Sequence, residues 1–329
     1  MSNPTLEASR RLANRARANA CAHPRVRAKP ILPGATYLIT RRCVGRQFLL
    51  RPEPKLNAAL GYWLALCAQR TGVHLHAACV MSNHIHIVLT DPNGTMPEFK
   101  NRFFAGLARY VNVLRGRCDS VFSADRACDV RLLDDHDVID RIAYTLANPV
   151  KAALVRRSKH WPGFTTAGWK FGETRHFEKP CLFFDANNSA LPDTVELPLQ
   201  APKLRSARSA RSASSVALNI AHRLQQRERL ATAEHAAAGI RILGPKHVLK
   251  QSWTATPRSI EPKFGLRPIV SVTSKWVRIA ALQTLKTWKA AYALAREAFI
   301  AGRRDVPFPA GTYALVKVAG VLVESPQLT

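Results

Sequence analysis

Histidines alternate with isoleucines in one short stretch, and this pattern restricts how the surrounding chain can fold. Residues 81–90 read Met-Ser-Asn-His-Ile-His-Ile-Val-Leu-Thr. Side chains alternate between the two faces of a β-strand, so His84 and His86 share one face while Ile85 and Ile87 share the other. The aliphatic face can enter a hydrophobic core, and two imidazoles at this spacing can chelate one divalent ion. The stretch therefore predicts a strand with a candidate metal site on one face.

The flanking sequence predicts an α+β fold. Runs of β-branched and aromatic residues indicate strands, and apolar residues at helical spacing indicate amphipathic helices. The predicted strands are residues 36–40, 73–81, 84–90 and 130–133, and the predicted helices are 54–70, 97–114 and 137–148, the last ended by Pro149. The order β-α-β-β-α-β-α is that of a ferredoxin-like fold, an antiparallel sheet with helices on one face, plus a further helix. Farther along, the pattern predicts a helix at 276–299 and a strand at 313–323.

The predicted helix at 137–148 has a polar face. Apolar residues around Ile142 define its buried stripe. Tyr144 and Asn148, one turn apart, lie roughly opposite that stripe with Arg141 beside them. Two interpretations stay open: Tyr144 is an ordinary surface residue, or these three side chains line a polar groove.

The two stretches together resemble the REP-associated tyrosine transposases, which belong to the single-tyrosine HUH transposases. That family has an Asn-His-x-His strand followed by a Tyr-Ile-x-x-Asn-Pro-Val-x-Ala-Gly-Leu-Val helix. The counterparts here are residues 83–86 and, about 60 residues later, residues 144–155, where Thr145 and Ala153 depart from the pattern. The resemblance covers residues 34–170, about half of the chain, and does not explain the C-terminal half. A second pair, His74 and His76, falls outside the matched motif, and we expect it to be structural or exposed.

The resemblance implies a metal-dependent single-strand DNA endonuclease and strand transferase, that is, a transposase. Tyr144 would be the nucleophile, forming a 5′-phosphotyrosine intermediate and a free 3′-hydroxyl. His84, His86 and Asn148 would hold a divalent metal ion, Mg²⁺ or Mn²⁺. The implied partner is single-stranded or hairpin DNA, such as REP-like palindromes. Related proteins include monomers and homodimers, so both states remain open for this chain, and the implied location is the bacterial cytoplasm.

The charge of the chain favours a nucleic-acid partner. Lys and Arg number 49 against 22 Asp and Glu, a formal net charge of +27. A surplus of this size attracts polyanions such as phosphate backbones. Arg102, Arg109 and Arg141 are the candidate DNA-binding residues. Residues 203–229 are also rich in arginine, and either a solvated linker or a nucleic-acid-contacting arm would account for them.

Other patterns argue against membrane insertion and secretion. The most apolar stretch, residues 58–68, is far shorter than the ~20 residues that a membrane span needs. No apolar segment follows the N-terminal arginines, so we expect no secretory signal. The seven cysteines are scattered and predict reduced thiols in a cytosol rather than a disulfide framework.

We predict four regions along the chain. They are a basic N-terminal arm at 1–33, the HUH transposase domain at 34–175, a basic linker at 176–235 and a C-terminal extension at 236–329, a small α/β unit of unknown role. Two alternative functions make different demands. A non-catalytic nucleic-acid-binding protein derived from a transposase would hold a hairpin equally well without metal. An H-x-H metallohydrolase would need further ligands on regularly spaced strands, and the downstream sequence lacks that strand–helix alternation.

Overall fold

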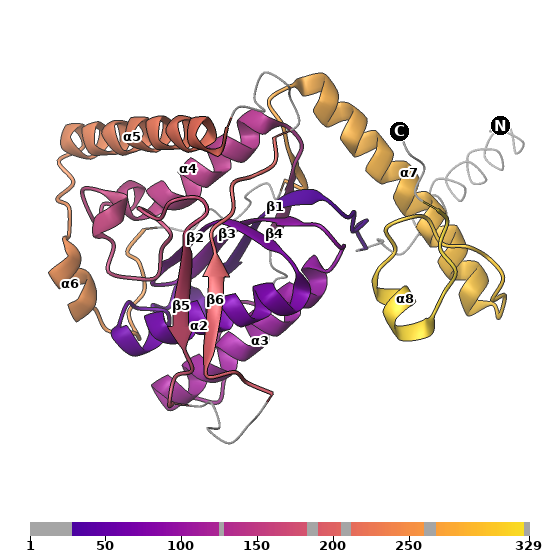
Figure 1. Cartoon of the computed structure of the whole chain (residues 1–329), viewed down its shortest axis with the longest axis horizontal. Helices are drawn as coiled ribbons and strands as arrows, with labels where there is room; N and C mark the ends of the chain where they lie inside the picture. The colour runs from indigo at the N-terminus through magenta and orange to yellow at the C-terminus, as the bar shows by residue number, and fades with distance from the viewer. Residues whose placement is uncertain (1–27, 125–127, 183–189, 205–211, 260–267, 326–329) are drawn as a thin grey trace, which may run out of the picture. The chain divides into compact units, whose positions relative to one another are not determined.

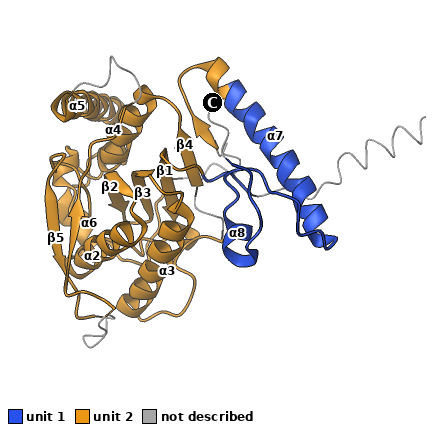
Figure 2. Cartoon of the chain, turned by 45° about the vertical axis from the view of Figure 1, so that its right-hand side comes forward, with its two compact units in different colours: residues 1–31, 279–329 blue, residues 32–278 orange. Residues whose placement is uncertain are grey.

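The structure is a computed structural model of the chain and divides into two compact units (Figure 2). It describes residues 28–124, 128–182, 190–204, 212–259 and 268–325. One unit comprises residues 32–278 and contains both motifs; the other comprises residues 1–31 and 279–329. Most of the predicted N-terminal arm lies outside the described residues. The four regions predicted from the sequence remain predictions.

A five-stranded sheet lies at the centre of the larger unit (Figure 1). In spatial order its strands are β2 (His74–Met81), β3 (His84–Asp91), β1 (Ala35–Arg42), β4 (Cys128–Leu132) and β7 (Val270–Ser271). The pairs β2–β3, β3–β1 and β1–β4 are antiparallel, which is the arrangement of a ferredoxin-like fold. The predicted α+β class is therefore confirmed. The parallel pairing of β7 with β4 makes the sheet mixed, a feature that the sequence did not predict.

Helices cover both faces of this sheet (Figure 1). α2 (Pro54–Thr71) and α3 (Met96–Arg115) lie on one face, as predicted. The further helix, α4 (Asp135–Lys151), lies on the other face and is accompanied by α5 (Ala213–Ala237). Residues 203–229 were predicted to be a solvated linker or a nucleic-acid-contacting arm. The later part of this stretch instead belongs to α5, which packs against α4. Within the described residues, no helix combines the length and apolar character needed to cross a membrane.

The proline in α4 does not end the helix, and here the sequence-based prediction is wrong. Pro149 lies inside α4, which continues to Lys151. A proline lacks the N–H that would bond to the carbonyl four residues earlier, that of Thr145. The Asn148 side chain supplies a substitute, because its Nδ2 donates to the Thr145 carbonyl at 3.2 Å. The helix therefore passes the proline with that carbonyl still hydrogen-bonded.

Smaller elements complete the larger unit. Two short 3₁₀ segments, Val44–Arg46 and Ser158–His160, and α6 (Pro245–Lys250) lie between the main elements. A separate hairpin, β5 (Thr174–Glu178) and β6 (Thr194–Pro198), packs against α2. A glycine on α2 makes this contact possible, because a Cβ at Gly61 would lie 2.1 Å from the Phe177 ring.

In the smaller unit one predicted element is confirmed and one is wrong. The predicted helix at 276–299 is α7 (Lys275–Ile300), most of which belongs to this unit. The predicted strand at 313–323 instead contains a short helix, α8 (Ala314–Ala319). A short apolar run does not distinguish a strand from a helix by its periodicity. Gly320 follows α8 as its C-cap, and its φ of 58° is the left-handed conformation that commonly terminates helices.

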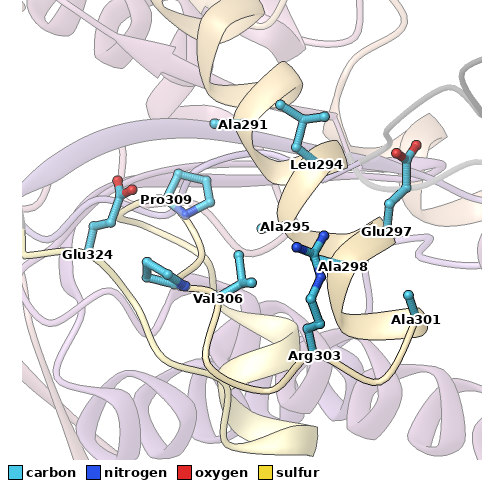
Figure 3. A pocket seen from close by; sticks show the side chains of 11 residues that line it. Ala291, Leu294, Ala295, Glu297, Ala298, Ala301, Arg303, Val306, Pro309 and Glu324 are labelled. Atoms are coloured by element: carbon cyan, nitrogen blue, oxygen red, sulfur yellow. The ribbon is translucent and has the colours of Figure 1, made fainter.

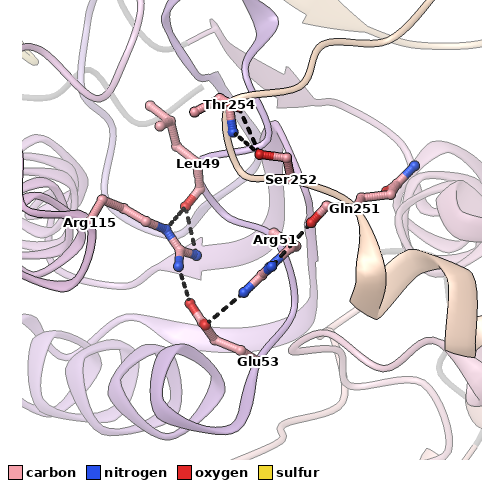
Figure 4. A network of polar contacts seen from close by, with 7 residues as sticks. All are labelled: Leu49, Arg51, Glu53, Arg115, Gln251, Ser252 and Thr254. Atoms are coloured by element: carbon pink, nitrogen blue, oxygen red, sulfur yellow. Dashed lines mark hydrogen bonds and ion pairs between the residues drawn. The ribbon is translucent and has the colours of Figure 1, made fainter.

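A network of ion pairs joins the start of α2 to the end of α3 (Figure 4). The Glu53 carboxylate pairs with Arg115 and also with Arg51, the latter at 3.1 Å. The Arg115 side chain is only 4% exposed and also donates to the Leu49 carbonyl. Arg51 donates to the Gln251 carbonyl at 3.1 Å, which ties a distant segment to the same network. Glu53 is therefore the anion between two guanidinium groups.

Candidate active site

β3 places the two motif histidines on one face of the sheet, as the alternation predicts. Ile85 and Ile87 are almost completely buried on the opposite face. His86 is buried and His84 is partly buried. Their ring centroids lie 4.8 Å apart, with the ring planes perpendicular. The two imidazoles therefore form a compact pair.

Hydrogen bonds orient both imidazole rings. The Asn83 Nδ2 donates to the Arg46 carbonyl, so the Asn83 Oδ1 faces the ring of His84 at 2.7 Å from Nδ1. Because Oδ1 can only accept, Nδ1 of His84 carries the proton and the lone pair lies on Nε2. Nδ1 of His86 lies 3.0 Å from the Thr40 hydroxyl. Hydrogen bonding at one ring nitrogen, leaving the other to ligate, is typical of metal-binding histidines.

Desolvation favours the neutral form of both histidines. It lowers the pKa of His84 to about 4, and the positive charges of Arg42 and Arg46 act in the same direction. The pKa of His86 is also well below its usual value, because of burial first and then the neighbouring His84 and Arg42. Neutral imidazole is the form that ligates a metal. The pair thus fits a divalent ion in donor type and in protonation state.

α4 brings Tyr144 against this pair. The rings of Tyr144 and His86 meet edge to face, with centroids 5.6 Å apart and an interplanar angle of 84°. The hydrophobic core sets this position, because Ile142 and Leu146 of α4 pack in one cluster with Val88 of β3. Of the two interpretations of Tyr144, the one that places it in a polar site agrees with this contact. The second motif therefore meets the first in space.

Three cationic side chains surround the Tyr144 ring. The guanidinium carbon of Arg141 lies 5.8 Å from the ring centroid, and Nζ of Lys151 lies 5.7 Å from it. Arg141 and Lys151 precede and follow Tyr144 by about one and two helical turns on the same helix. The third cation, Arg227, comes from α5 and also lies 5.8 Å away. Arg227 lies too far along the chain for any local sequence signal to place it here. Lys151 could have been found from its helical spacing to Tyr144.

Asn148 follows Tyr144 by one turn and is buried. Its Nδ2 donates to the carbonyls of Tyr144 at 2.9 Å and Thr145 at 3.2 Å. With the nitrogen on these carbonyls, the oxygen Oδ1 is the atom that could ligate a metal ion. The structure thus assigns Asn148 a helix-supporting contact, and its role as a ligand stays a prediction.

The other two candidate DNA-binding arginines lie away from Tyr144. Arg102 and Arg109 are exposed on α3, which covers the face of the sheet opposite α4 (Figures 1 and 2). Arg102 pairs with Glu98 one turn before it, at 2.9 Å. The structure therefore brings only Arg141 of the three to Tyr144. DNA contact by Arg102 and Arg109 remains a prediction.

The second histidine pair has a structural member, as expected. His76 is 2% exposed; its Nδ1 lies 2.7 Å from the Gln200 carbonyl and its Nε2 lies 2.8 Å from the Thr90 hydroxyl. Burial lowers its pKa to about 4. Both ring nitrogens are thus engaged in hydrogen bonds within the fold.

A second cluster of metal-ligating side chains lies at the start of α4 and was not predicted. Oxygen or nitrogen atoms of Asp134, His136 and Asp137 lie within 4.8 Å of one another. The run Asp-Asp-His-Asp in the sequence was an available signal. Two of these side chains have structural partners: Asp134 accepts from the backbone N–H groups of Asp137 and Thr273, and His136 contacts Arg223. The cluster is compatible with a divalent ion, and these contacts account for the positions of Asp134 and His136.

The smaller unit contains a cavity of about 530 Å³ (Figure 3). Small and aliphatic side chains of α7, among them Leu294 and Ala298, form one wall. Arg303 and Glu324 add charged groups at its edge. None of the motif residues lines this cavity.

Transposases are among the solved structures that this chain is similar to. No protein-family model and no curated protein sequence matches the chain. Among solved structures, the chain is similar to a REP-associated tyrosine transposase bound to a REP hairpin, with 21% identity and a TM-score of 0.34 over 44% of this chain and 82% of that one. It is also similar to a putative transposase from Deinococcus radiodurans R1, with 15% identity and a TM-score of 0.26 over 34% of this chain and 88% of that one. The first belongs to the family that the two motifs resemble.

Proposed function

We propose that this protein is a metal-dependent endonuclease and strand transferase that cleaves single-stranded, hairpin-forming DNA through a 5′-phosphotyrosine intermediate. One observation carries the proposal. Tyr144 of the second motif lies against His86 of the first, and cationic side chains surround its ring. A nucleophile beside a candidate metal-binding pair and positive charge is an arrangement that promotes attack on a phosphodiester.

The proposed reaction exchanges one phosphodiester for another. The phenol oxygen of Tyr144 bonds to the phosphorus of the scissile phosphate, and the bond from phosphorus to the 3′-oxygen breaks. The phenolic proton passes to water, and the departing oxygen takes up a proton to become a free 3′-hydroxyl. Because a phosphoester bond is kept, attack by another 3′-hydroxyl can rejoin strands without ATP. Arg141 and Lys151 supply positive charge for the phosphate.

Three side chains would hold the divalent ion. They are His84 and His86 through Nε2 and Asn148 through Oδ1. Mg²⁺ prefers oxygen ligands, whereas Mn²⁺ tolerates imidazole, so both are candidates. When bound, the ion polarises the scissile phosphate and offsets the charge that gathers on its oxygens.

The charge and the site also support proposals for the partner and the oligomeric state. The net charge of +27 favours a polyanion, and Tyr144 is partly exposed, which suits a single strand or hairpin end. The contact between Tyr144 and His86 lies within one chain. We therefore propose that a monomer is sufficient for cleavage.

The test uses a labelled library of single-stranded hairpin oligonucleotides with Mn²⁺, followed by a denaturing gel. We expect a protein-linked DNA band that is lost in Tyr144→Phe and on addition of EDTA. Tyr292→Phe on α7 makes the same chemical change outside the site and should keep the band. A band that persists in Tyr144→Phe would remove Tyr144 as the nucleophile. Hairpins that shift on a native gel without any linked band would instead indicate a DNA-binding protein without catalysis.

A further inference from the structure

Helix α5 lies outside the matched motifs but is packed firmly along α4. Near its start, Val216 and Ile220 are buried in the same hydrophobic cluster as Ile142 of α4. Near its end, Ala231 packs in a second cluster with Val150 of α4. The apolar contacts at both ends fix the register of one helix on the other. Side chains from the middle of α5 therefore have defined positions beside α4.

Polar contacts hold the middle of α5 as well. Nη2 of Arg227 lies 2.6 Å from Oδ1 of Asp140 on α4. One residue later, the Glu228 carboxylate accepts the backbone N–H of Ser158 at 2.7 Å. The Arg227 side chain is about one-third exposed, so the anchored guanidinium remains accessible to a ligand. Its five N–H donors exceed what a single contact to one carboxylate oxygen uses.

This anchored guanidinium lies beside Tyr144, 5.8 Å from the centre of its ring. We propose that Arg227 is a phosphate-binding residue of the active site, contacting the scissile phosphate during attack and the phosphate of the phosphotyrosine afterwards. The inference rests on the proposed function of Tyr144. It makes part of the C-terminal half, which the family resemblance leaves unexplained, a component of the active site.

The chemistry of the side chain fits this role. A guanidinium presents a planar fork of donors that matches two phosphate oxygens, and it stays charged at all relevant pH values. Asp140 holds the fork in place before substrate arrives, so little reorganisation is needed when charge develops. Arg141 approaches the same ring from α4. Two arginines from two helices would thus bind the phosphate together.

The first experiment measures the rate of adduct formation with saturating hairpin DNA and Mn²⁺. Removal of one preorganised hydrogen-bond donor that stabilises developing charge slows such steps by about 10²–10³-fold. We expect this loss of rate for Arg227→Gln. Arg227→Lys should be slow as well, because an ammonium lacks the fork. Arg223→Gln is the matched control: it removes one charge from the same helix and one contact to α4, at His136. We expect it to retain nearly the wild-type rate.

A second readout does not depend on activity. In a Tyr144→Phe background, hairpin affinity is compared between a normal scissile phosphate and a neutral methylphosphonate at that position. With Arg227 present, the neutral linkage should weaken binding by about 10–100-fold, the range for hydrogen bonds to a charged group. With Arg227→Gln this difference should become several-fold smaller, and the remainder should come from Arg141 and Lys151, which still face the phosphate. If Arg227 had a purely structural role, Arg227→Gln would weaken the binding of both oligonucleotides equally.

The outcomes separate the two proposals. If the wild-type protein forms no adduct with any hairpin, the proposed function fails. If it forms the adduct and Arg227→Gln reacts at the rate of Arg223→Gln, the proposed function stands and the role of Arg227 is refuted. Should Arg227→Gln fail to fold, Arg227→Lys in the methylphosphonate comparison decides, because unchanged discrimination with lysine would refute the need for the guanidinium fork.

Discussion

Replacement of Glu53 by glutamine tests whether the ion-pair network at the junction of α2 and α3 stabilises the larger unit. The change keeps the shape of the side chain and removes its charge. In the native structure the carboxylate lies between Arg115 and Arg51 (Figure 4). Without it, two guanidinium groups remain close together with no anion between them. Burial already lowers the pKa of Arg115, and Glu53 is the main group that opposes this effect.

The expected loss of stability follows from how exposed the side chains of the ion pair are. Breaking a fully buried ion pair costs about 3–5 kcal/mol, and breaking an exposed pair costs about 0–1 kcal/mol. The Arg115 side chain is 4% exposed and that of Glu53 is 21% exposed, so the pair is closer to the buried limit. We expect a loss of about 2–3 kcal/mol in the free energy of unfolding. For a unit of this size the melting temperature should fall by about 5–10 °C.

The assay is thermal unfolding of the full chain, with Glu98→Gln as the matched control. Glu98 pairs with Arg102 on the surface of α3, where both side chains are substantially exposed. Both variants raise the net charge by one, so the general repulsion within this basic chain changes equally. The control should lose about 0.5 kcal/mol or less. Equal shifts in melting temperature for the two variants would refute the reasoning, because general repulsion would then account for both.

Two further predictions concern histidines. Asn83→Ala removes the acceptor that orients His84 and should weaken Mn²⁺ binding by about 10–100-fold in calorimetry, whereas Asn83→Asp keeps an acceptor and should bind more tightly than Asn83→Ala. Equal affinities for the two variants would contradict this role. His76 has a pKa of about 4 in the folded protein and about 6.5 when unfolded, so between these values the unfolded chain binds a proton that the folded chain does not. The linked contribution of His76 to the free energy of unfolding is therefore fully present above pH 6.5. It is lost as the pH falls to 4, a decrease of about 3 kcal/mol. His76→Gln should flatten the dependence of the melting temperature on pH over this range, and parallel profiles for the two proteins would argue against it.

Local patterns predicted strands β1 to β4 and helices α2 to α4 of the larger unit, but not its hairpin β5–β6, helices α5 and α6 or strand β7. The alternation around His84 and His86 placed both on one face of a strand, because side-chain direction in a strand depends only on the position along it. The helices were predicted from their apolar spacing for the same reason. Two of the errors were also local. A helix was ended at Pro149 although Asn148 satisfies the freed carbonyl, and residues 313–323 were assigned to a strand although their pattern is ambiguous.

For the candidate site, too, the sequence predicted one part and the tertiary structure supplied the other. From the sequence alone came the two motifs, the residue types that suit metal binding and phosphate attack, and the positive charge that suits DNA. Only the tertiary structure showed that Tyr144 meets His86 and that Arg227, from another helix, lies beside the same ring. Such contacts depend on which faces of helices and sheet pack together, and the hydrophobic clusters between α4, α5 and the sheet decide this. Periodicity along the chain shows which face of each element is apolar but does not show which other element covers it.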